Sequence, residues 1–172
     1  MNAYIIYIQG HEDSEKFSDR CLQSIIDTES DLTVEKFPAI TPENMWKVNY
    51  TWPLRKKIKC PKTGLLLSAY KTYDNNKRIA AAQSHYMLWR KCVSENKPIM
   101  ILEHDAIFTK KFDGNILEWW PGEGAVSIND PIGATFSAKE YDRKLHNGIN
   151  EVPWLTGNDV PQGLPGHSAY VI

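Results

Sequence analysis

The chain has 172 residues, enough for one domain with a sizeable core, and it carries a formal net charge of -1. Its hydrophobic share of 42% and charged share of 24% are those of a folded globular protein and argue against disorder. The nearly balanced charge removes the general electrostatic reason to expect a nucleic-acid partner.

The cysteines are widely spaced and odd in number, and they form no paired motif of the kind that binds zinc or builds a disulfide framework: Cys21, Cys60 and Cys92. No apolar run approaches the roughly 20 residues of a membrane span. The opening residues also lack the basic leader of a signal peptide. We therefore expect a cytoplasmic protein without a transmembrane segment.

The first part of the chain has the pattern of a βαβ unit. Residues 3–8 are β-branched and aromatic, which predicts a buried strand. A helix is predicted next, over about residues 10–25, with Ser14 or Asp13 as its N-cap. Residues 31–37 alternate in polarity and predict a second strand. A strand, a helix and a strand in this order are typical of a parallel sheet.

The signal then weakens into a long irregular loop, expected at about residues 41–75. A helix is predicted over residues 77–94, and the all-apolar run 99–102 predicts a strand buried on both faces. Residues 125–128 and 168–172 are two further strand candidates. Helical spacing predicts this buried stripe on the helix: Ile79, Ala82, Tyr86, Trp89 and Val93.

Together these elements predict an α/β fold. We expect a mainly parallel, Rossmann-like sheet flanked by helices, within a single domain over residues 1–172.

Two acids, Glu103 and Asp105, come directly after the predicted strand 99–102. Ligands of open α/β sheets bind beyond the carboxyl ends of the strands. If the extended backbone continues for three residues, both acids project to one side, where they repel each other unless a cation lies between them. Mg²⁺ and Mn²⁺ prefer such oxygen ligands and leave positions for substrate phosphates. The pattern predicts a metal-bridged diphosphate, with ion pairs to Lys110 and Lys111 as the alternative.

Several short phrases follow one another along the chain in a recognisable order: Phe37-Pro-Ala39, Ser84-His85, Leu88-Trp89, Ile101-Leu-Glu-His-Asp-Ala106 and Ala169-Tyr-Val-Ile172. By these phrases the chain resembles glycosyltransferase family 25, which is known from lipopolysaccharide biosynthesis and collagen galactosylation. The middle acid of the family's acidic phrase is His104 here, while the outer acids are kept.

The resemblance implies a GT-A-like domain, shorter than usual, that transfers a hexose with inversion from a UDP-sugar to a glycan or other acceptor hydroxyl. Galactose or glucose would be the sugar. Asp105 and Glu103 would bind the Mn²⁺ or Mg²⁺ ion on the diphosphate. The resemblance places Gln9, Ser84 and His85 at the donor, together with Glu103.

The general base is assigned to one of two alternatives, Asp130 or Asp159, because each lies near a predicted strand end. The alternative for each is a turn residue, which is the more common role of Asp beside Asn, Gly or Pro. His167 is a further candidate metal ligand.

Two other functions stay open. The exchange at His104 motivates a catalytically silent relative that keeps the fold as a glycan-binding module. A nucleotide-diphosphate enzyme that transfers no sugar is the remaining alternative.

Overall fold

The computed structural model describes residues 1–47, 58–59, 66–67, 73–120, 122, 124–129 and 168–172. The contacts divide the chain into two compact units, of which the first comprises Met1–Met45, Asn75–Asn129 and His167–Ile172 and the second Trp46–Asp74 and Asp130–Gly166. The first unit holds the sheet and the long helices and is described here in detail. The prediction of a single domain stays a prediction.

A five-stranded sheet forms the centre of the first unit, in the order β2-β1-β5-β7-β6. Strand β1 pairs in parallel with both β2 and β5, while β7 pairs antiparallel with β5 and β6. Within this sheet β7 therefore runs opposite to the other four strands, and the predicted mainly parallel sheet is confirmed. The bounds of the strands are Asn2–Tyr7 for β1, Thr33–Pro38 for β2, Ile99–Glu103 for β5, Val126–Ser127 for β6 and Ala169–Val171 for β7.

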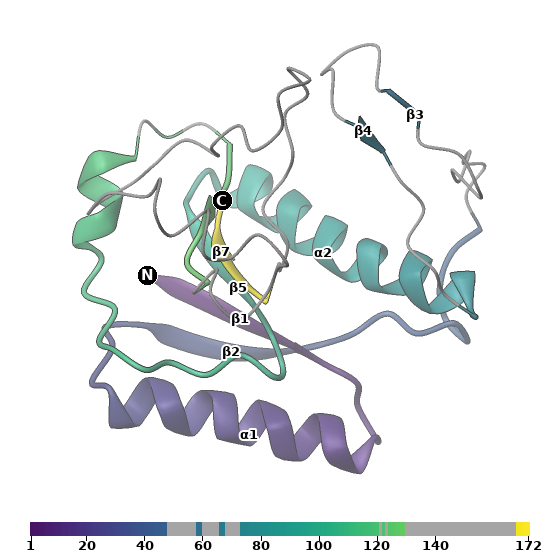
Figure 1. Cartoon of the computed structure of the whole chain (residues 1–172), viewed down its shortest axis with the longest axis horizontal. Helices are drawn as coiled ribbons and strands as arrows, with labels where there is room; N and C mark the ends of the chain where they lie inside the picture. Colours follow the sequence, from purple (N-terminus) through teal and green to yellow (C-terminus); the bar gives the residue numbers. More distant parts are fainter. Residues whose placement is uncertain (48–57, 60–65, 68–72, 121, 123, 130–167) are drawn as a thin grey trace. The chain divides into compact units, whose positions relative to one another are not determined.

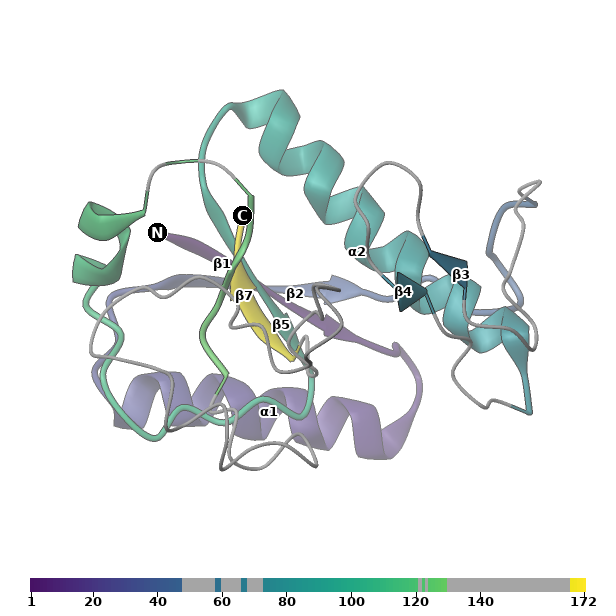
Figure 2. The same cartoon turned by 45° about the horizontal axis from the view of Figure 1, so that its top comes forward.

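Two helices cover opposite faces of the sheet (Figure 1; Figure 2). Helix α1 (Glu12–Asp27) connects β1 to β2, and helix α2 (Asn75–Glu95) leads into β5. Both helices and all five strands lie where the sequence predicts them, with ends that differ by a few residues.

The N-cap of α1 is His11, so the prediction of Ser14 or Asp13 is wrong. The Nδ1 atom of His11 accepts the N–H of Ser14 at 3.4 Å. The hydroxyl of Ser14 instead accepts the N–H of Ile8 at 2.8 Å, which ties the end of β1 to the first turn of the helix. Gly10 allows the tight turn between them because its φ is +80°.

The core has two clusters of buried residues, one on each face of the sheet, because successive strand residues point to opposite faces. The cluster under α1 is made of Ala3, Ile5, Cys21, Ile25, Met100, Leu102, Ala106, Ala169 and Val171. The cluster under α2 is made of Tyr4, Ile6, Leu88, Ile99, Ile101 and Tyr170. Strand β5 contributes to both, as expected for a strand buried on both faces.

The buried stripe of α2 differs from the prediction. Of the predicted residues, Ile79 is buried, whereas Ala82, Tyr86, Trp89 and Val93 are exposed. The face that is buried consists of Ile79, Ala80, Gln83, Ser84 and Leu88. Polar side chains form part of that face, so a pattern built on apolar residues alone selects the wrong side of the helix.

The predicted loop at about 41–75 contains a short antiparallel strand pair, β3 (Ile58–Lys59) and β4 (Leu66–Leu67), which the sequence analysis missed. Strands of this length are too short to show a periodicity. The first unit also contains the 3-10 helix η1 (Asn115–Trp119). Over the described ranges, no helix combines the length and the apolar character needed to cross a membrane.

Candidate active site

The carboxyl ends of three parallel strands meet at one edge of the sheet. Ile6 of β1 lies opposite Phe37 of β2 and opposite Glu103 of β5 in the strand register. Gln9 follows β1 at this edge and is exposed in the turn that leads to α1. Open α/β sheets bind ligands at this edge. The structure therefore brings Gln9 and Glu103 to the same edge of the sheet.

Ser84 lies beside this edge, but its side chain is completely buried. Its hydroxyl accepts the N–H of Ile40 at 2.8 Å and donates to the C=O of Ala80 at 3.0 Å. Ile40 follows β2, so this hydrogen bond connects the segment after β2 to helix α2. Ser84 shapes the edge through this bond and presents no exposed atom to a ligand.

His85 connects helix α2 to the end of β5. Its Nε2 atom lies 3.5 Å from Oε1 of Glu103, and its side chain is 14% exposed. On the other side of the ring, Nδ1 lies 2.8 Å from the hydroxyl of Tyr170. Nε1 of Trp89 donates to the same hydroxyl at 2.7 Å. Four side chains thus form one polar chain from α2 and β7 to the strand end.

The hydroxyl of Tyr170 keeps its proton at neutral pH. Burial raises the pKa of Tyr170 to about 12, and the charge of Glu103 adds to this, against the hydrogen bond from Trp89. Because Trp89 has only a donor, the hydroxyl accepts from it and keeps a second lone pair and its own proton for Nδ1 of His85. The tautomer of His85 decides which of the two groups donates in that contact.

Strand β5 ends at Glu103, and the next residues turn. The N–H of Ala106 donates to the C=O of Glu103 at 3.0 Å, which closes the turn. The expectation that the extended backbone continues through Asp105 is therefore wrong, and strand alternation does not place the two carboxylates. The ring of His104 stacks on Phe17 of α1, with centroids 6.0 Å apart.

The residues after β5 are able to offer two carboxylates to a ligand. The side chain of Glu103 is 41% exposed, and Asp105 is exposed. No group of three or more metal-binding side chains forms among the described residues. Mg²⁺ commonly takes only one or two protein carboxylates and completes its shell with water and substrate phosphates. Glu103 and Asp105 offer oxygen ligands of the type that such a cation takes.

The charge of Asp105 also affects the pKa of Cys21 in helix α1. Burial raises the pKa of Cys21 to about 12, the charge of Asp105 raises it further, and Arg20 opposes this. Asp105 therefore lies close enough to α1 to affect a thiol in the core.

Three predicted site residues lie outside the described part of the chain: Asp130, Asp159 and His167. Their roles stay predictions.

Sequence reasoning missed Trp89 and Tyr170 as parts of this site. Trp89 was assigned to the buried stripe and Tyr170 only to a strand. One signal was available, because His85 and Trp89 are four residues apart and so lie on the same face of a helix.

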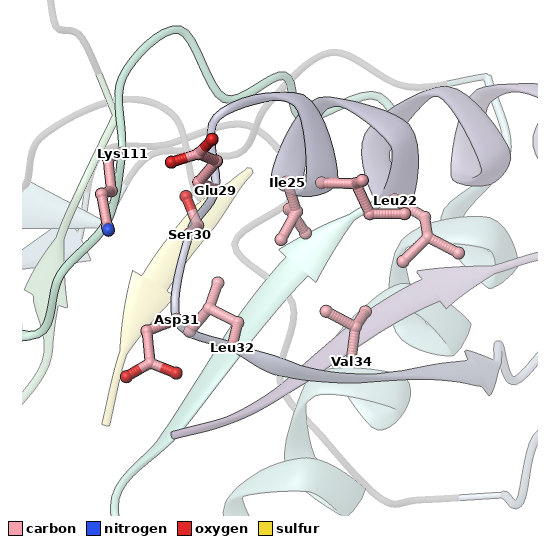
Figure 3. A pocket seen from close by; sticks show the side chains of 9 residues that line it. Leu22, Ile25, Glu29, Ser30, Asp31, Leu32, Val34 and Lys111 are labelled. Carbon is pink, nitrogen blue, oxygen red and sulfur yellow. The ribbon is translucent and has the colours of Figure 1, made fainter.

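A hollow of about 540 Å³ lies elsewhere, between the end of α1 and the start of β2 (Figure 3). Since β2 runs parallel to β1 and β1 to β5, the start of β2 lies at the opposite end of the sheet from Glu103. The hollow is therefore separate from the candidate site. Its lining comprises Leu22, Ile25, Ile26, Glu29, Ser30, Asp31, Leu32, Val34 and Lys111.

Comparison with protein families matched the chain to a known family. The sequence model of glycosyltransferase family 25 (LPS biosynthesis protein) matches residues 11–120, which is more than half of the chain and includes Ser84, His85, Glu103 and Asp105. Comparisons with curated proteins and with solved structures gave no match.

Proposed function

Because the chain belongs to glycosyltransferase family 25, we propose that it transfers a hexose from a UDP-sugar to a hydroxyl group of a glycan, with inversion and with a divalent cation. Family membership confirms the resemblance predicted from the sequence, and it implies glycosyltransferase activity with a nucleotide-sugar donor and an acceptor. Galactose or glucose as the sugar, UDP as the nucleotide and Mn²⁺ or Mg²⁺ as the cation belong to the proposal.

The observation that carries the proposal is the pair of acids at the end of β5. Glu103 and Asp105 lie within the range matched by the family and next to the carboxyl edge of three parallel strands. When bound, the cation would supply positive charge against the diphosphate that leaves the sugar. Asp105 and Glu103 would hold it, and Gln9 at the same edge would contact the donor.

The transfer needs one further group. The acceptor oxygen bonds to the anomeric carbon, the bond from that carbon to the UDP oxygen breaks, and a base takes the proton of the acceptor hydroxyl. We propose Asp130 or Asp159 as this base and His167 as an additional cation ligand.

The fold is part of the proposal as well. A mainly parallel sheet with one reversed strand next to the strand that carries the acids supports a GT-A-like domain. A cytoplasmic location is proposed because Cys21 and Cys92 are free.

One observation favours a second candidate function. His104 stacks on Phe17 and so takes a packing role at the position where the family has its middle acid. A catalytically silent module that binds glycan would tolerate this exchange.

Release of nucleotide from a panel of UDP-, GDP- and CDP-sugars tests the proposal. We expect release from UDP-hexose with Mn²⁺, its loss in EDTA, and its loss in Asp105→Asn. Asp31→Asn is the matched control, because Asp31 lies at the hollow on the opposite end of the sheet. A protein that binds glycan but releases no nucleotide with any sugar would contradict the proposal and support the silent module.

A further inference from the structure

We propose that Tyr170 is a positioning residue of the cation site. Its hydroxyl accepts a hydrogen bond from Trp89 and holds the imidazole of His85 in place. His85 in turn orients the carboxylate of Glu103. The inference rests on the proposed function, because it assigns Glu103 to the cation.

The first support is geometric. The hydroxyl of Tyr170 has contacts of 2.8 Å to Nδ1 of His85 and 2.7 Å to Nε1 of Trp89. The rings of His85 and Tyr170 also stack, with an angle of 22° between their planes. The position of the imidazole is therefore set by β7 as well as by its own helix.

The backbone places Glu103 against the same strand. Its N–H donates to the C=O of Ser168 at 2.8 Å, directly before β7. Leu102 is paired with Ala169 in the register of β5 and β7. Glu103 is thus connected to the β7 segment in two ways. One is the backbone bond to Ser168, and the other is the side-chain contact through His85 to Tyr170.

The second support is that Tyr170 is itself held in place. Trp89 has only a donor, so the hydroxyl of Tyr170 accepts from it, and the same hydroxyl bonds Nδ1 of His85. Nε2 of His85 lies 3.5 Å from the carboxylate of Glu103, which is longer than an ordinary hydrogen bond. We expect this contact to shorten when the cation binds.

Burial assigns Tyr170 to positioning and not to catalysis. Its side chain is 5% exposed, so it does not touch a substrate at the edge of the sheet. Partners that orient a metal-binding carboxylate or histidine affect metal affinity, and their loss typically costs 10–100-fold. Tyr170 acts through His85, so we expect an effect near the lower end of that range.

The test is a calorimetric titration of Mn²⁺ into the protein with a fixed concentration of UDP. Tyr170→Phe removes only the hydroxyl, and we expect the affinity for Mn²⁺ to fall about tenfold. Tyr4→Phe is the matched control, because Tyr4 is equally buried in the same core cluster but belongs to β1. It should keep the affinity of the parent protein, so a loss of packing or stability alone is distinguished from a loss of positioning.

Substitutions of His85 separate its two contacts. In His85→Gln, the amide nitrogen occupies the position of Nε2 and is able to bond Glu103. In His85→Asn, the shorter side chain puts the amide nitrogen at the position of Nδ1, next to Tyr170. We expect Gln to keep more of the Mn²⁺ affinity than Asn. In the His85→Gln protein, Tyr170→Phe should cause no further loss, because the two residues act in series.

The outcomes are distinguishable. If the parent protein shows no Mn²⁺-dependent UDP binding, the proposed function fails and the inference falls with it. If the parent protein binds and Tyr170→Phe matches Tyr4→Phe, the function stands and the inference is overturned. Should Tyr170→Phe fail to fold, Trp89→Phe removes the donor to the same hydroxyl from a partly exposed position. An unchanged Mn²⁺ affinity in Trp89→Phe would equally overturn the inference.

Discussion

Nε2 of His85 lies 3.5 Å from Oε1 of Glu103, which places an imidazole beside the acid that ends strand β5, whose other four residues are buried. A carboxylate at the end of an apolar run needs a partner or access to water. Glu103 has both, because 41% of its side chain is exposed. One part of the carboxylate thus faces the protein and the rest is available to a ligand.

Glu103→Gln separates a structural role of this pair from a role in cation binding. Gln keeps the shape of the side chain and an oxygen that accepts from His85, but it removes the negative charge. We expect the stability to change by less than about 1 kcal/mol. Metal-dependent nucleotide release should fall by about a hundredfold, since the variant loses the negative charge that would hold the cation against the leaving diphosphate.

Steady-state kinetics with varied Mn²⁺, together with urea unfolding, checks this prediction. Glu29→Gln is the matched control, because Glu29 lies at the hollow on the opposite end of the sheet. Equal activity of the two variants would show that Glu103 serves only the contact with His85.

Leu88→Ala tests which face of α2 is buried. Leu88 is completely buried beneath the helix, while Val93 is 80% exposed on the face that hydrophobic spacing selects. Removing a buried leucine costs about 2–5 kcal/mol, so we expect a loss in this range. Val93→Ala should change the free energy of unfolding by less than about 0.5 kcal/mol. Urea unfolding of the two variants measures both free energies. A larger loss in Val93→Ala than in Leu88→Ala would contradict the burial of the Leu88 face.

Ser84→Ala tests the bond between α2 and the segment after β2. Without the hydroxyl, the half-buried N–H of Ile40 loses its acceptor, and we expect a loss of about 1 kcal/mol, the lower end of the range for an unsatisfied donor. The matched control is Ser94→Ala on the same helix, because the hydroxyl of Ser94 is exposed and bonds only to Lys91. Similar unfolding free energies for both variants would show that the bond to Ile40 contributes nothing.

The framework of the sheet was predictable from sequence because its strands are apolar and bounded by turns. The run 99–102 is all apolar, and each of its residues is buried in β5. The buried face of α2 was not predictable in this way, because the polar residues Gln83 and Ser84 form part of it. The hydroxyl of Ser84 bonds Ile40 of another segment, which no local pattern shows.

The site was predictable only in part. The resemblance drew attention to His85 and Glu103, and the structure places them in contact. The turn after Glu103 was missed because a hydrogen bond from Ala106, and not side-chain polarity, ends the strand. Tyr170 was missed because its sequence distance from His85 hides a contact that forms only when β7 pairs with β5.

Stability should fall at alkaline pH. The pKa of Cys21 is raised from 9.0 to about 12 in the folded protein, chiefly by burial. In the unfolded chain the thiol loses its proton near its ordinary value, so the unfolded state binds fewer protons between the two values. The contribution of Cys21 to stability is therefore complete below about pH 9 and is lost progressively as the pH rises to about 12.

Urea unfolding under reducing conditions, from neutral to strongly alkaline pH, measures this decline. Cys21→Ala should make the first part of the decline shallower than in the parent protein. Tyr170 adds to the later part, because its pKa is raised from 10.0 to about 12. The same decline in Cys21→Ala as in the parent protein would assign the alkaline loss to other groups.

The central claim is that Glu103 and Asp105 share a divalent cation with the diphosphate of the donor. A crystal structure of the protein with Mn²⁺ and UDP, using the anomalous signal of manganese, tests it directly. The account predicts a manganese ion within coordination distance of Asp105 and of both phosphates, with Glu103 completing the site directly or through water. A diphosphate bound without manganese at these acids, or manganese bound elsewhere, would contradict it.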